Sequence, residues 1–201
     1  MPKYLKKLEK SMTQKNTILA TLTSVLVLTI FMTISATPKA DAAAADYFLK
    51  VEGIEGESID RTHGGQIELE SWSWGASQAG SASLGGTGKV QFTDFHFTKT
   101  VDKSSPKLVE ALASGEHIPS IELTVRKAGD QPLEYMKVKL SDCIVSSYSV
   151  AGGSTAGGDK PMESISLNFA KIEFEYTEQK ADGSAGATTR MGWDLAKNIR
   201  V

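Results

Sequence analysis

The chain has 201 residues, of which 40% are hydrophobic and 23% charged, and its formal net charge at pH 7 is −2. This composition excludes a disordered or fibrous protein, and the weakly acidic balance disfavours binding to nucleic acid through charge. Cys143 is the single cysteine, which excludes an intrachain disulfide and a cysteine-based zinc site. We expect Cys143 to be a small buried residue in a strand.

Residues 1–42 are predicted to be a secretory signal peptide, followed by one domain at 43–201. Lysines precede an uncharged stretch, residues 16–38, and the A-x-A spacing of a cleavage site follows at Ala40 and Ala42. This pattern predicts export to the periplasm. The apolar run is also about long enough to span a bilayer, so an uncleaved membrane anchor is one alternative. A misassigned start codon is another.

From Asp46 onward, apolar and polar residues mostly alternate, which is typical of half-buried strands. A short strand is expected at 47–51 and a second at 121–125. A long strand is expected at 136–150, with its apolar residues on even positions. These strands predict a mainly β domain.

Two further segments change the phase of this alternation. Ile67 and Leu69 are odd, whereas Trp72 and Trp74 are even, and a similar change occurs inside 165–176. Such a change indicates either a β-bulge, here near Ser71 and near Ala170, or a strand buried on both faces. Bulges would provide the bends that a closed, strongly twisted barrel needs.

One short helix is predicted after Ser104. Ser105 is expected to be its N-cap residue and Pro106 its first helical residue, and Gly115 is expected to end it. Glycine-bearing loops are expected at 75–88, 152–158 and 183–186. The predicted fold is a closed, twisted antiparallel β-barrel or two-sheet sandwich with one short α-helix.

Motifs for catalysis or metal binding are weak. Ser104 and Lys107 match the S-x-x-K spacing of penicillin-recognising enzymes, but the partner motifs S-D-N and K-T-G are absent from the chain. GGTGKV at 85–90 lacks the first glycine, the final hydroxyl residue and the helix of a phosphate-binding loop. His63, His96 and His117 are isolated, and no spacing predicts zinc. We therefore predict no catalytic, cofactor or metal site.

Several longer blocks identify a family. DYFLKVEGIEGES, THGGQIELESWSWG, DFHFTKTVDKSSPKLVEALASGEH, ELTVRKAG, SLNFAKIEFEYTEQKADGS and GWDLAKNIRV occur in this order. Over residues 46–201 the chain resembles the Hcp proteins of bacterial type VI secretion systems. The resemblance implies a helix-capped β-barrel that assembles into a hexameric ring. Such rings stack into an inner tube, which a contractile sheath expels with a spike protein at its tip.

The resemblance also implies roles for particular residues. The protein would be no enzyme, would need no cofactor, and would carry small effector proteins in the ring lumen. Trp72 and Trp74 would anchor a barrel strand, and Ser73 between them would face the lumen, because neighbouring strand residues point to opposite faces. The alternative is that Ser73 is an ordinary polar surface residue.

Residues 77–88 are similar to the extended loop through which rings of this family contact each other. Small residues there would allow the backbone of the next ring to approach, and a disordered loop tip is the alternative. The residues expected in ring stacking are Ser77, Gly80, Ser83, Gly85, Gly86 and Gly88.

The N-terminal segment departs from the family pattern, since Hcp proteins are normally assembled in the cytoplasm before secretion. Two functions therefore stay open. The first is a subunit of the secretion tube. The second is an exported, Hcp-like ring-forming or binding protein that acts in the periplasm or outside the cell.

Overall fold

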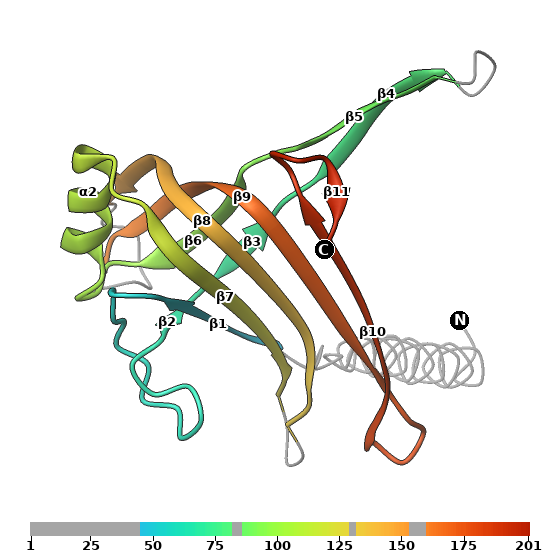
Figure 1. Ribbon diagram of the computed structural model, residues 1–201. Coiled ribbons are helices and arrows are strands. Elements are labelled where there is room, and N and C mark those ends of the chain that lie inside the picture. Colours follow the sequence, from blue (N-terminus) through green and yellow to red (C-terminus); the bar gives the residue numbers. More distant parts are fainter. Residues whose placement is uncertain (1–44, 82–85, 129–131, 153–159) are drawn as a thin grey trace, which may run out of the picture. The chain divides into compact units, whose positions relative to one another are not determined.

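The computed structural model describes residues 45–81, 86–128, 132–152 and 160–201. The chain divides into two units, Met1–Ala42 and Ala43–Val201, and the second is described here by itself. Its described residues form a nine-stranded antiparallel sheet, a separate two-stranded ribbon and one short helix (Figure 1). The predicted fold class, mainly β with a single short helix, is confirmed.

The large sheet follows the order β11-β10-β9-β8-β7-β1-β2, and β6 joins it by pairing with both β9 and β3. Its two longest strands, β8 and β9, have 18 residues each. The strands are β1 (Ala45–Val51), β2 (Ile67–Glu68), β3 (Ser71–Ser73), β6 (Phe95–Thr100), β7 (Ile118–Lys127), β8 (Glu134–Ala151), β9 (Met162–Gln179), β10 (Ala185–Asp194) and β11 (Ile199–Arg200).

The two sides of the curved sheet are joined by one short segment. β2 pairs with β1, whereas β3, a few residues further on, pairs with β6. Between them, Leu69 N donates to Tyr47 O at 3.0 Å and Glu70 N donates to Thr98 O at 2.9 Å. The structure therefore does not show the continuous closed barrel that was predicted, because this segment divides between two neighbours instead of forming one regular strand.

Both predicted phase changes coincide with a change of neighbouring strand. The first lies between β2 and β3, where the neighbour changes from β1 to β6 and no bulge forms at Ser71. In β9, residues up to Leu167 pair with β6, and residues from Lys171 onward pair with β10.

The bulge predicted near Ala170 is wrong. β9 keeps its register with β8 on both sides of Ala170, and the register shift between these strands lies between Val145 and Ser147. Asp142 on β8 has a φ of 53°. Asp is one of the few residues that tolerate this left-handed conformation. The even phase predicted for all of β8 is therefore also wrong: Val138 and Leu140 are buried before Asp142, whereas Cys143 and Val145 are buried after it.

Cys143 is fully buried in a strand, as predicted. Burial raises the pKa of its thiol to about 12. The thiol therefore stays protonated at neutral pH and is a poor nucleophile.

The helix α2 (Ser105–Ser114) packs Leu108 and Ala111 into the core and ends at Gly115, which has a φ of 68°. Ser104 is its N-cap residue, so the prediction that Ser105 caps the helix is wrong. Ser105 is the first helical residue, and its hydroxyl binds a buried ion pair described below. Pro106 lies in the first helical turn, where its missing N–H costs little.

The segment predicted as a long glycine-rich loop is largely a β-ribbon. β4 (Ala76–Ser81) and β5 (Gly86–Phe92) pair with each other and with no other described strand. Ser77, Gly80, Gly86 and Gly88 lie in these two strands, whereas Ser83 and Gly85 lie outside the described residues. In Figure 1 the ribbon extends away from the large sheet.

No helix in the described part of the chain has the length and apolar character needed to cross a membrane. The predicted signal peptide, with its alternative as an anchor, lies outside these residues and stays a prediction.

Candidate functional site

Two rows of small polar side chains cross four strands of the large sheet. Residues directly opposite each other in an antiparallel pair share one face of the sheet, so the two rows form a single surface, the polar face. In the strand order β3, β6, β9 and β8, the rows are Ser73, His96, Ser166 and Ser147, and Ser71, Thr98, Ser164 and Ser149.

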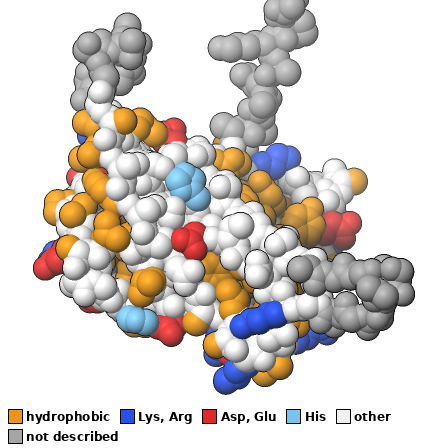
Figure 2. Space-filling view, turned by 90° about the horizontal axis from the view of Figure 1, so that it is seen from above, with side chains coloured by type: hydrophobic (Ala, Val, Ile, Leu, Met, Phe, Trp, Pro, Cys, Tyr) orange, Lys and Arg blue, Asp and Glu red, His pale blue; other side chains and the backbone are white. Residues whose placement is uncertain are grey.

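The polar face carries hydroxyl groups and one imidazole. The His96 ring lies between two serines, with Nδ1 3.2 Å from Ser166 Oγ and Nε2 3.1 Å from Ser164 Oγ. Figure 2 shows the molecule from above, where mostly white side chains and backbone surround a histidine and an acidic side chain lies near it. The eight residues of the polar face therefore offer hydroxyl groups and an imidazole. Asp94, two residues before His96, adds a carboxylate next to them, which accepts a hydrogen bond from Asn168 Nδ2 at 2.9 Å.

Ser73 is exposed on this face, while its two neighbours pack on the other side of the strand. The Trp72 ring stacks on Phe95 at a centroid distance of 6.4 Å, and the Trp74 ring stacks on Phe92 at 6.2 Å. These contacts hold β3 and the start of β4 against the core. They also determine the direction in which Ser73 points.

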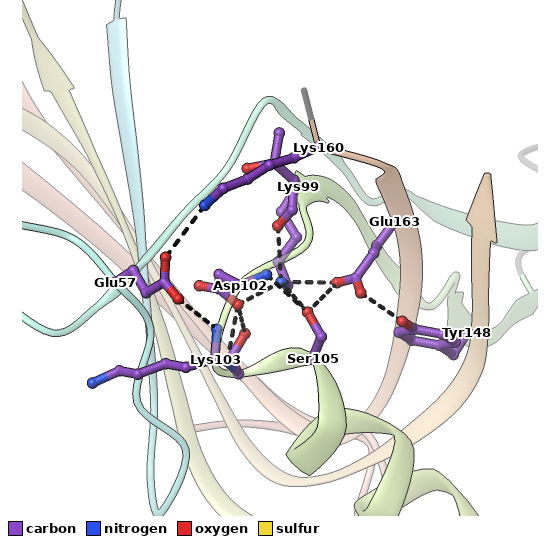
Figure 3. A network of polar contacts seen from close by, with 10 residues as sticks. Glu57, Lys99, Asp102, Lys103, Ser105, Tyr148, Lys160 and Glu163 are labelled. Carbon is purple, nitrogen blue, oxygen red and sulfur yellow. Dashed lines mark hydrogen bonds and ion pairs between the residues drawn. The ribbon is translucent and has the colours of Figure 1, made fainter. Parts of the chain in front are cut away.

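A buried ion pair lies where β6 and β9 meet the start of α2 (Figure 3). Lys99 Nζ is 2.8 Å from Glu163 Oε2 and 2.7 Å from Asp102 Oδ1. Lys99 is 0% exposed and Glu163 1% exposed. Burying these charges is unfavourable unless hydrogen bonds satisfy the remaining polar atoms.

Hydroxyl groups provide those hydrogen bonds. The Ser105 hydroxyl accepts from Lys99 Nζ at 3.0 Å and donates to Glu163 Oε2 at 2.9 Å. The Tyr148 hydroxyl donates to Glu163 Oε1 at 2.5 Å. Burial, together with this hydrogen bond, raises the pKa of Tyr148 to about 12. The network thus joins β6, β8, β9 and α2.

Asp102 closes the network on the side of the helix. Burial alone would raise the pKa of its carboxyl group, but the hydrogen bonds from Lys99 and Ser104 outweigh burial and lower it. At the exposed edge, Glu57 accepts hydrogen bonds from Lys103 N at 3.0 Å and Lys160 Nζ at 3.3 Å. The ionised carboxylates thus connect the start of α2 to neighbouring segments.

The Lys99–Glu163 pair was not predicted from the sequence, although the alternation within the two strands indicates it. Lys99 follows Phe95 and Phe97 at the same odd positions, and Glu163 precedes Ile165 in the same way, so both charges occupy inward-facing positions of their strands. Two charged residues of opposite sign at inward positions predict a buried pair. Only the register of β6 with β9, where Lys99 opposes Glu163, brings them together.

The S-x-x-K residues do not face each other. The Ser104 hydroxyl donates to Asp102 Oδ1 at 2.5 Å, whereas the exposed Lys107 pairs with Glu110 at 2.7 Å. The described residues contain no group of three or more His, Cys, Asp or Glu side chains arranged to hold a metal ion.

Comparisons with known proteins agree on one family. A family model described as "Type VI secretion system effector, Hcp" matches residues 48–176. The chain is 43% identical over 163 residues to Protein hcp1 of Pseudomonas aeruginosa, which covers 79% of this chain and 99% of that protein.

Solved structures give the same result. Hcp1 from Salmonella typhimurium is 38% identical with a TM-score of 0.68, and the match covers 79% of this chain and 99% of that one. A structure described as a type six secretion system protein is 31% identical with a TM-score of 0.73, and the match covers 79% of this chain and 100% of that one. A type VI secretion system effector from Yersinia pestis is 32% identical with a TM-score of 0.62, and the match covers 74% of this chain and 99% of that one.

Proposed function

The chain belongs to the Hcp family of type VI secretion proteins, and from this premise we propose that it is a structural subunit of the secretion tube. In this proposal, hexameric rings of the chain stack into the inner tube and carry small effector proteins in their lumen. The observation that carries the proposal is the polar face around Ser73, which would line the lumen.

The chemistry of the polar face suits a channel for folded cargo. Hydroxyl groups both donate and accept hydrogen bonds, so they can contact many different polar surfaces directly or through water. The face lacks the large apolar side chains that would hold a partner tightly. Cargo would therefore be held by many weak contacts, repeated around the ring, and could still be released.

The β4–β5 ribbon is the proposed contact between stacked rings. Its two strands pair only with each other among the described strands, so each keeps an outer edge with free backbone N–H and C=O groups. A two-stranded ribbon is marginally stable alone, and contact with another ring would stabilise it. The spike protein and the sheath would be the further partners of the assembled tube, which performs no catalysis.

Ring formation is the direct test of this proposal. Electron microscopy of the protein starting at Ala43 is expected to show rings with six-fold symmetry, and stacks of rings at high concentration. Analytical ultracentrifugation would give the mass of the assembly independently. A protein that remains strictly monomeric at high concentration would contradict the proposed tube subunit.

Replacing Ser73 with tryptophan is expected to leave the rings intact and to reduce the retention of a co-expressed effector protein by about tenfold or more. A loss of about 1.4 kcal/mol in cargo binding is sufficient for that change, and a bulky ring on the lumen surface would cause it by steric hindrance. Co-purification of the effector with the ring, quantified by size-exclusion chromatography, is the measurement. Ser114→Trp is the matched control, because Ser114 is an exposed serine on α2. If Ser73→Trp instead abolished the rings, Ser73 would lie in a subunit contact and not in the lumen.

A further inference from the structure

One carboxylate adjoins the polar face. Asp94 directly precedes β6 and lies two residues before His96, so both side chains point to the same side of the sheet. Asp94 Oδ1 accepts a hydrogen bond from Asn168 Nδ2 at 2.9 Å, and Asn168 lies two residues beyond Ser166 on β9. Asp94 and Asn168 therefore begin a further row beside the polar face, next to the row that contains Ser73.

A second hydrogen bond holds this carboxylate from β8. The Ser146 hydroxyl donates to Asp94 Oδ2 at 2.5 Å. Ser146 lies at the register shift between β8 and β9, where Val145 and Ser147 pair with successive residues of β9 and Ser146 pairs with none. Such a β-bulge redirects a side chain out of the regular alternation. Here it helps three segments of the chain to hold one negative charge in place.

Neither hydrogen-bond partner of this carboxylate carries a charge. A serine hydroxyl and an asparagine amide donate to Asp94, but they do not neutralise it. By contrast, Asp60 pairs with Arg126, and Glu175 pairs with Arg190. In the part of the chain that the structure describes, Asp94 therefore presents a fixed negative charge without a cationic partner.

The neighbouring rows provide no ammonium or guanidinium group that would cancel this charge. Besides the two rows of the polar face, they are the row of Asp94, Asn168 and Ile144 and, at the other end, the row of Thr100, Met162 and Ala151. In the proposed ring, six copies of Asp94 would surround one channel. The fields of like charges that line a narrow opening add to each other and attract molecules of the opposite charge.

We propose that Asp94 sets the charge preference of the lumen, so that the ring retains small proteins with a basic surface better than those with an acidic surface. The inference rests on the proposed function and names the class of cargo that the polar face selects. Hydroxyl groups can contact any polar surface, whereas a fixed carboxylate favours ammonium and guanidinium groups and repels carboxylates. Asp94 thus determines specificity, and the serine rows provide the contacts common to all cargo.

Binding of charged peptides to purified rings tests this inference. Fluorescein-labelled octalysine is expected to bind wild-type rings roughly tenfold more tightly than Asp94→Asn rings at about 50 mM salt, because several carboxylates act on one peptide. The difference should shrink to about twofold or less at about 300 mM salt, where exposed charges are screened. Octaglutamate is expected to bind both kinds of ring weakly. Fluorescence anisotropy at about pH 8, above the range in which histidine ordinarily gains a proton, gives the dissociation constants.

Two further variants separate the charge of Asp94 from its support of the strands. Glu173→Gln is the matched control, since Glu173 is an exposed acid of β9 outside the polar face, and it is expected to change octalysine binding by less than about twofold. The double variant Asp94→Asn, Ser73→Asp returns one carboxylate per subunit to the same side of the sheet. It is expected to recover most of the lost affinity. A purely structural role of Asp94 would give no recovery and would lower the melting temperature of the dissociated subunit instead.

The outcomes distinguish this inference from the proposed function. Rings that bind octalysine equally well with and without Asp94→Asn overturn the inference and leave the tube subunit standing. If Asp94→Asn failed to assemble, Ser73→Asp alone would decide: it is expected to raise octalysine affinity by roughly threefold or more, and unchanged affinity would overturn the inference. Absence of rings in the wild-type protein contradicts the proposed function itself.

Discussion

Replacing Lys99 with methionine is expected to lower the free energy of unfolding by about 3–5 kcal/mol, because removing one partner of a buried ion pair leaves the other charge uncompensated. Glu163 is 1% exposed and would keep only its hydroxyl partners, Ser105 and Tyr148. The start of α2 would lose its attachment to β6 as well. Urea unfolding of the dissociated subunit, followed by tryptophan fluorescence, measures the change.

Two control variants show whether the buried charge is the cause. The double variant Lys99→Met, Glu163→Leu removes both charges and is expected to recover most of the lost stability. Lys103→Met breaks the exposed pair of Lys103 with Glu55 and is expected to cost less than about 1 kcal/mol. A loss below about 1 kcal/mol for Lys99→Met would show that water or rearrangement compensates for Glu163.

Replacing Phe95 with alanine is expected to lower the free energy of unfolding by about 3–5 kcal/mol, because a fully buried ring would leave a cavity. Phe95 is 0% exposed, and its ring lies 6.4 Å from Trp72 and 6.2 Å from Phe97. The loss would also remove the support on which Trp72 is stacked. Urea unfolding gives the stability, and a change in the tryptophan emission of the folded protein, to which Trp72 contributes, reports the local change.

Val109→Ala is the control for Phe95→Ala. It shortens an exposed apolar side chain on α2 and is expected to change stability by less than about 0.5 kcal/mol. If Phe95→Ala were as mild as this control, the core around β3 and β6 would be able to collapse around the missing ring. The orientation of Ser73 would then depend less on Trp72 than the stacking indicates.

Only the part of the candidate site that depends on alternation within one strand, the direction of Ser73, could be predicted from the sequence. Alternation places Ser73 on the face opposite Trp72 and Trp74, and the structure shows this arrangement. The rest of the polar face depends on which strands are neighbours. His96 and Ser166 join Ser73 only because β6 lies between β3 and β9 in one register.

Competition between partners explains the prediction that failed at the helix. A serine before proline is a good N-cap in isolation, because its hydroxyl can bind the free N–H groups of the first turn. In the folded chain the Ser105 hydroxyl instead binds Lys99 and Glu163, which are buried and cannot be satisfied by water. Lys99 lies six residues before Ser105, but Glu163 comes from a distant strand, β9, that no local pattern contains.

Composition, local alternation and matched blocks of residues were sufficient to predict the strand-rich fold class, the single short helix, the burial of Cys143 and the family. The tertiary structure decided what depends on neighbours far apart in the chain: where β9 changes from β6 to β10, why Asp142 shifts the phase of β8, and how Lys99 meets Glu163. The physical reason is that alternation specifies which face a residue occupies. Long-range pairing specifies what lies opposite it.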